Sequence, residues 1–205
     1  MLQLNTPGRL GLISLGLAVL AACNPAADVG PTSQYALDRS VEMSDNALVG
    51  AWYGELNGNE AYVHVVESPR TGSALQTLIV GQQDRRGNSD GWGEALAIPA
   101  RIGAQGYLSV KLDKFKGEAS NETDYLIVRY HTRDRRHVSL YAMDPDRVAD
   151  AIKGGRISGT SRDRIDSSPD ELVKFIENAG GEDLFSVQIG YLERVSENDI
   201  PTVQR

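Results

Sequence analysis

Hydrophobic and polar residues alternate along the middle of the chain in short runs that end at turn residues. Between Leu48 and about Met143, apolar side chains recur at every second position, which is the period of a β-strand with one buried face. Asn57-Gly58-Asn59 is a hairpin signal, because Asn and Gly tolerate the positive φ angles of tight turns. The pattern predicts seven strands, near residues 49–56, 61–67, 74–81, 92–100, 106–112, 123–131 and 136–143.

The connections between these strands are short, and a parallel crossover needs a dozen or more residues, so the strands are expected to be antiparallel. Seven consecutive antiparallel strands must bury one face and protect two edges. A last strand near 185–195 is expected to pair with the first and close the sheet. The predicted fold is therefore mainly β, an antiparallel eight-stranded barrel or strongly curled sheet with two short helices before the last strand.

The two helices are indicated by their caps and by a helical apolar period. Asp144-Pro145 is a cap followed by a first-turn proline, and the short apolar stripe after it ends at Gly154-Gly155. Ser168-Pro169-Asp170-Glu171 is a capping box that opens a second helix, which Gly180-Gly181 terminates. Apolar residues at helical spacing give this second helix its buried face.

The amino terminus has the features of a secretory signal. Arg9 precedes an apolar run of about eleven residues, which is too short to span a membrane and has the length of a signal-peptide core. Leu20-Ala21-Ala22-Cys23 follows and resembles the lipobox of bacterial lipoproteins. The resemblance implies cleavage between Ala22 and Cys23 and attachment of acyl chains to Cys23. It also implies sorting to the outer membrane, because Asn24, rather than aspartate, follows the cysteine.

These features divide the chain into four parts. Residues 1–22 are expected to be the signal peptide, residues 23–46 the lipidated cysteine and a flexible tether, residues 47–197 the β domain, and residues 198–205 a tail. The tether is expected because the segment is polar, contains two prolines and has no sustained period.

Net charge and cysteine count exclude several classes of function. The net charge of −7, from 21 Lys and Arg against 28 Asp and Glu, argues against a nucleic-acid-binding protein, which needs a concentrated basic face. A single cysteine forms no intramolecular disulfide and builds no thiolate zinc site. We therefore expect no metal and no cofactor, and a membrane contact that comes from the lipid anchor.

Two short motifs in the β domain resemble signatures of the lipocalins. Gly50-Ala51-Trp52 opens the first strand like G-x-W, and Thr123-Asp124-Tyr125 opens the sixth like T-D-Y. The resemblance implies an eight-stranded barrel around a small apolar ligand, with Trp52 packed across the closed end. The family's third signature, an arginine that packs against the tryptophan, has no counterpart after Tyr141-Ala142-Met143, and two helices stand where the family has one.

The candidate site residues are few. Trp52, Tyr62, His64 and Trp92 are candidates for a pocket or for the end of the barrel, although isolated strand aromatics more often belong to a core. His64 alternates with its neighbours on a predicted strand and is the one candidate general base. The sequence contains no HExxH, GxSxG or phosphate-cradling glycine loop, so a non-enzymatic protein is expected.

A basic cluster stands out against the acidic background. It consists of Arg129, Arg133, Arg135 and Arg136 and is a candidate patch for an anionic partner. The alternative is a charged hairpin tip that keeps the end of the sheet soluble.

The sequence favours a periplasm-facing lipoprotein that binds a small hydrophobic ligand or serves maintenance of the cell envelope. Two alternatives stay open. One is a protein-interaction module, an inhibitor or an assembly accessory, that acts through the sheet rim or the Arg129–Arg136 hairpin. The other is a hydrolase that uses His64.

Overall fold

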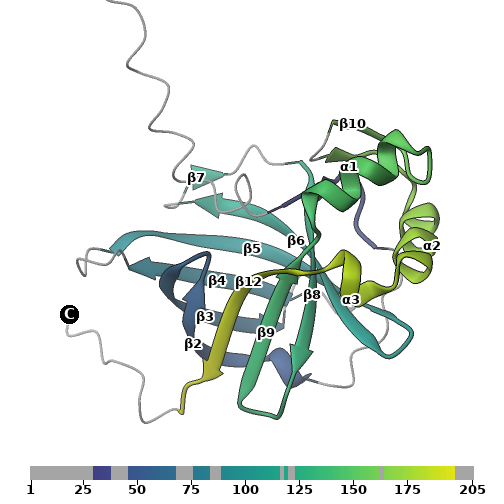
Figure 1. The fold of residues 1–205 in the computed structure, drawn as a ribbon. Helices are drawn as coiled ribbons and strands as arrows, with labels where there is room; N and C mark the ends of the chain where they lie inside the picture. Colours follow the sequence, from purple (N-terminus) through teal and green to yellow (C-terminus); the bar gives the residue numbers. More distant parts are fainter. Residues whose placement is uncertain are drawn as a thin grey trace, which may run out of the picture.

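The structure is a computed structural model that describes residues 30–37, 46–67, 76–83, 89–115, 118–119, 123–161 and 164–196. It is mainly β, with one mixed sheet and three α-helices (Figure 1). The signal peptide, Cys23, the outer parts of the expected tether and the tail lie outside the described residues. The elements are β1 (Thr32–Ser33), the 3-10 helix η2 (Asn46–Leu48), β2 (Gly50–Leu56), β3 (Asn59–Glu67), β4 (Gln76–Gln83), β5 (Ser89–Ile102), β6 (Gln105–Phe115), β7 (Glu118–Ala119), β8 (Tyr125–Thr132), β9 (His137–Ala142), α1 (Pro145–Lys153), β10 (Gly159–Ser161), β11 (Arg164–Ile165), α2 (Pro169–Ala179), α3 (Gly181–Leu184) and β12 (Val187–Arg194).

The antiparallel pairing expected from the short connections is confirmed. Each of β2 to β6 pairs antiparallel with the next, and β8 pairs in the same way with β9. The β2–β3 turn places Asn57 at φ +53° and Gly58 at φ +74°, the positive angles that the Asn-Gly signal predicts. The last strand pairs with the first, as expected, because β12 lies antiparallel to β2.

Gly54 permits the close approach of these two strands. A Cβ added at Gly54 would overlap the carbonyl oxygen of Tyr191 and crowd the backbone of Leu192. Any larger residue at this position would push β12 away from β2.

The twelve-stranded sheet has the order β10-β11-β1-β8-β9-β12-β2-β3-β4-β5-β6-β7. It is not closed as a whole, because β10 and β7 are its two ends, and it is mixed because β1 and β11 are parallel. One additional antiparallel pairing joins β6 to β8, from Gly106 opposite Tyr130 to Val110 opposite Leu126. β6, near one end of the strand order, is therefore hydrogen-bonded to β8, which lies near the other end.

Part of the segment expected to be tether belongs to the folded domain, so the prediction of a flexible tether is wrong for residues 30–37. Thr32–Ser33 pairs with both β8 and β11, and the Gln34 amide donates to the Ile165 carbonyl oxygen at 2.9 Å. Leu37 is 1% exposed, and its amide donates to Ser109 Oγ at 2.9 Å. Strand pairing uses backbone groups that every residue carries. A polar segment with one buried leucine can therefore join the folded domain without an apolar period in its sequence.

Replacing Leu37 by alanine tests this assignment. We expect a loss of about 2–4 kcal/mol in the free energy of unfolding, because a fully buried leucine leaves a cavity. Urea denaturation of the purified protein measures the change. Tyr35→Ala is the matched control, because Tyr35 is 42% exposed, and it should shift stability by less than about 0.5 kcal/mol. Equal effects of the two substitutions would contradict the placement of residues 30–37 in the folding unit.

The buried residues form two apolar clusters on opposite faces of the sheet. One lies on the face to which Trp52, Val63, Leu108 and Leu126 point. The other packs α1, α2 and α3 against the opposite face of β6 and β8, where Tyr107 and Ile127 lie. Figure 1 shows the three helices beside β6 and β8 and away from β2 and β3.

Both predicted helices begin where their caps indicate. Asp144 Oδ1 accepts from the amides of Asp146 and Arg147, at 2.9 and 3.2 Å. At α2, Glu171 Oε2 accepts from the Ser168 amide at 3.0 Å and from Ser168 Oγ at 2.9 Å. These bonds from Ser168 lower the pKa of the Glu171 carboxyl. The four-residue helix α3 that follows Gly180 was not predicted.

Candidate functional site

One face of the eight longer strands, which we call the inner face, carries one of the two apolar clusters, the one away from the helices. Its described members are small or medium-sized on β3 and β5, where alanine and valine predominate, and larger on β2, β6 and β8. The members are Leu48, Trp52, Ala61, Val63, Val65, Ala97, Leu108, Leu126, Val128, Val138, Ala142, Ile189 and Leu192.

Trp52 and Arg194 tie together the segments that meet beside this face. The Arg194 guanidinium lies 4.4 Å from the Trp52 ring centroid, and Trp52 is 2% exposed. Trp52 Nε1 donates to the Leu48 carbonyl oxygen at 2.8 Å. A guanidinium over an indole face is a cation–π contact, which gains strength when it is shielded from water.

The Arg194 side chain also donates three hydrogen bonds to backbone oxygens. Nη1 donates to Val49 at 2.8 Å, Nη2 to Ala47 at 2.6 Å, and Nε to Arg135 at 3.0 Å. Gly50, at φ +137°, leaves the room required, because a Cβ there would lie 2.6 Å from Nη1. One side chain therefore joins the segment before β2, the β8–β9 turn and the end of β12.

Sequence reasoning did not find Arg194. We looked for the arginine directly after Met143, whereas it arrives on the last strand, after three helices. Arg194 reaches Trp52 because the two residues lie opposite each other in the pairing of β12 with β2. The signal available in the sequence was the expected pairing of the last strand with the first.

The Thr123-Asp124-Tyr125 motif anchors the other end of β8. Arg164 Nε donates to Asp124 Oδ2 at 2.7 Å, and Thr123 Oγ1 donates to Asp124 Oδ1 at 3.1 Å. Arg164 also pairs with Asp166 at 3.0 Å. The Arg164 hydrogen bond, against a smaller opposing effect of burial, lowers the pKa of the Asp124 carboxyl below its ordinary 3.8. This carboxylate links β8 to β11.

The lowered pKa of Asp124 predicts an acid-dependent loss of stability. A carboxyl whose pKa is lower in the folded than in the unfolded state stabilises the fold above the unfolded value, here 3.8. That contribution disappears as the pH falls through the folded pKa. Urea unfolding at several pH values should show Asp124→Asn less stable than wild type at pH 6, with the difference shrinking below pH about 4. A difference between the two proteins that is the same at pH 6 and pH 3 would contradict the ion pair.

The four arginines of the expected basic patch do not act together. Arg129 is 8% exposed and lies under α3, where its guanidinium is 4.9 Å from the Tyr141 ring and 3.5 Å from the Phe185 carbonyl oxygen. Arg133, Arg135 and Arg136 are exposed in the β8–β9 turn. The prediction of one surface cluster is therefore wrong for Arg129, because the alternation of β8 points this residue into the helical layer.

The structure also separates the four pocket candidates. Trp52 lies on the inner face, whereas Tyr62 and His64 are exposed on the outer face of β3. Trp92 belongs to β5, opposite Gly81 of β4. The His64 side chain makes no hydrogen bond to another described residue. Within the same residues, no three His, Cys, Asp or Glu side chains gather as metal ligands do.

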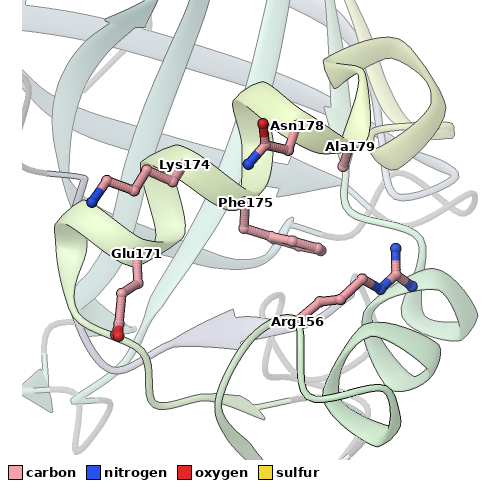
Figure 2. A pocket seen from close by; sticks show the side chains of 6 residues that line it. All are labelled: Arg156, Glu171, Lys174, Phe175, Asn178 and Ala179. Atoms are coloured by element: carbon pink, nitrogen blue, oxygen red, sulfur yellow. The ribbon is translucent and has the colours of Figure 1, made fainter.

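A surface groove of about 360 Å³ lies between α2 and the turn after α1 (Figure 2). Its walls carry both signs of charge, and Phe175, which points from α2 toward Arg156, is only 7% exposed. Because Arg156, Glu171 and Lys174 put charge on its walls, we do not assign a hydrophobic ligand to this groove. It is lined by Arg156, Glu171, Lys174, Phe175, Asn178 and Ala179.

Comparison with known proteins returns no match: no family model, no curated protein and no solved structure matches the chain. None of the helices in the described part is long and apolar enough to cross a membrane.

Proposed function

We propose that this protein is a non-enzymatic lipoprotein of the bacterial cell envelope, anchored through Cys23, whose β domain binds a small hydrophobic ligand. In this proposal the eight strands β2 to β6, β8, β9 and β12 form a lipocalin-like barrel. The ligand lies against the inner face, and the domain faces the periplasm from the outer membrane.

The observation that carries the proposal is the packing of Arg194 on Trp52. Gly50 and Trp52 belong to the lipocalin-like motif found in the sequence, and the family's third signature is an arginine on that tryptophan. The β12–β2 pairing supports the barrel because it joins the last strand to the first of the eight, and the β6–β8 pairing supports it because it joins β6 directly to the next of the eight strands. Departures from the family are the position of the three helices before the last strand and the further strands β1, β10 and β11.

The apolar inner face supports the choice of ligand. Its described residues carry no charge apart from Arg194, which is engaged with Trp52 and three carbonyl groups. An apolar enclosure with few polar groups binds through removal of apolar surface from water.

Filling the interior tests ligand binding. The double variant Val63→Phe, Ala97→Leu adds volume at two buried positions of β3 and β5. We expect binding of the neutral apolar fluorophore N-phenyl-1-naphthylamine to wild type and at least about tenfold weaker binding to the variant, since one or two apolar contacts are worth about that much. Fluorescence titration measures both constants.

The control places a similar change on the outer face. Ala51→Leu, on β2 and opposite His64, should leave the fluorophore's affinity within about twofold of wild type. Thermal unfolding by circular dichroism shows whether each variant is folded. Equal affinity of wild type and of a folded Val63→Phe, Ala97→Leu variant would contradict an interior site.

A further inference from the structure

The outer face of β12, β2 and β3 carries a regular array of tyrosine and glutamate. Each strand contributes one tyrosine and one glutamate two positions apart, so both side chains point to the same face. We call this surface the Tyr/Glu face and define it by six residues: Tyr53, Glu55, Glu60, Tyr62, Tyr191 and Glu193.

The strand registers arrange these side chains in two adjoining rows across the three strands. Glu193 lies opposite Tyr53, which lies opposite Tyr62. In the adjoining row, Tyr191 lies opposite Glu55, which lies opposite Glu60. Every tyrosine therefore has carboxylates beside it, both along its own strand and, for Tyr53 and Tyr191, across to the next.

The array is open to solvent. Tyr191 is 46% exposed and Tyr62 is 39% exposed, and they are two of the four large hydrophobic side chains that are exposed among the described residues. The Glu193 side chain is 62% exposed, and Glu55 and Glu60 are exposed as well. The helices cover the sheet beside β6 and β8 and leave β2 and β3 bare (Figure 1).

The negative charge of this face meets no Lys or Arg within its own strands, and its one basic contact is His137 of β9, whose Nε2 lies 3.8 Å from Glu193 Oε1. β2, β3 and β9 contain no Lys or Arg, and the one arginine of β12, Arg194, turns inward onto Trp52. Glu55 and Glu60 lie directly opposite each other, an arrangement that destabilises a strand pair by repulsion. A cation placed between them would relieve that repulsion.

The tyrosine rings of this face pack against neighbouring rings. The Tyr53 and Tyr62 ring centroids are 4.6 Å apart at 39°, and His137 stacks on Tyr191 at 5.9 Å and 17°. A guanidinium prefers an aromatic face for stacking and a carboxylate for paired hydrogen bonds. On the Tyr/Glu face a tyrosine ring and a carboxylate lie on adjacent strands, about 5 Å apart.

We propose that the Tyr/Glu face is a docking surface for an extended, arginine-bearing segment of another protein. Carboxylates that have no Lys or Arg partner on β2, β3 or β9, next to exposed rings, favour this partner over a glycan, because sugar hydroxyls need no excess of negative charge. Alternate residues of an extended segment point to one side, so arginines at every second position would all face the tyrosines and glutamates of the Tyr/Glu face.

The test is fluorescence anisotropy of a labelled peptide of four Arg-Gly repeats, titrated with the full-length protein purified from its host in detergent. We expect saturable binding that weakens with salt, and no binding of the matching citrulline-Gly peptide. Tyr62→Ser, Tyr191→Ser should weaken binding by about tenfold, and Glu55→Gln, Glu193→Gln, which keeps the side-chain shapes, by a similar factor.

Matched controls lie elsewhere on the surface. Tyr35→Ser and Asp183→Asn remove an exposed tyrosine and an exposed carboxylate from other segments and should leave affinity within about twofold. Thermal unfolding shows that each variant is folded. The proposal is overturned by equal binding of wild type and both double variants, by equal binding of the citrulline peptide, or by binding of a chitin oligosaccharide but not of the peptide. Self-association that the same variants abolish, without peptide binding, would overturn it too and assign the face to a second copy of this chain.

Discussion

Cys23→Ser should abolish the attachment of acyl chains to the protein. A serine hydroxyl does not replace the thiolate as the nucleophile that forms the thioether, so no acyl chain would be attached. Each buried methylene contributes about 0.8 kcal/mol, and two or three chains anchor a protein stably where none holds it. Metabolic labelling with an alkyne-bearing palmitate, followed by membrane flotation, measures both lipidation and anchoring.

The control separates anchoring from sorting. Asn24→Asp should keep the label and the membrane association but move the protein from the outer to the inner membrane, as the lipobox resemblance implies. Fractionation of the two membranes on a density gradient measures the distribution. A Cys23→Ser protein that still carries the palmitate label would contradict lipidation at this residue.

Trp52→Ala should have the largest effect on folding among single substitutions on the inner face. Trp52 is 2% exposed, and its removal leaves a cavity and takes away the surface on which Arg194 lies. We expect a loss of about 3–5 kcal/mol, a large part of the stability of a domain of this size. Urea unfolding followed by circular dichroism measures it, since the readout must not depend on the deleted indole.

A double-mutant cycle with Arg194→Ala shows whether the two side chains act as one unit. Arg194→Ala alone should cost about 2–3 kcal/mol, because three carbonyl oxygens lose a charged donor. The double variant should lose less than the sum of the two single losses. Arg101→Ala is the control, because Arg101 is exposed at the end of β5, and it should change stability by less than about 0.5 kcal/mol. Strictly additive losses would contradict the coupling.

The long strands were predictable because their inner face is apolar and their outer face is not. Val63 is buried between exposed Tyr62 and His64, and Leu192 is buried between exposed Tyr191 and Glu193. Local chemistry located the Asn57-Gly58 turn and the helix caps at Asp144 and Ser168. Each of these signals is contained within a few residues, so it can be recognised in the sequence without knowledge of the fold.

The features that sequence reasoning missed depend on distant partners. β1, β10 and β11 have two or three residues each and are held by backbone pairing, which leaves no period in the sequence. Arg129 and Arg133 carry the same charge and lie close together in the sequence. Only Arg129 is buried, because its position on β8 faces the helices. Arg194 meets Trp52 because two ends of the domain pair, and no local pattern encodes that contact.

Native mass spectrometry of the protein purified from its host tests the central proposal most directly. The account predicts a fraction of protein carrying a noncovalently bound small apolar molecule, in addition to the covalent acyl chains on Cys23. It also predicts that this noncovalent mass is lost in a folded Val63→Phe, Ala97→Leu variant. A wild-type protein that carries only its covalent lipid, or a bound molecule that the filled variant retains, would contradict a ligand site on the inner face of the sheet.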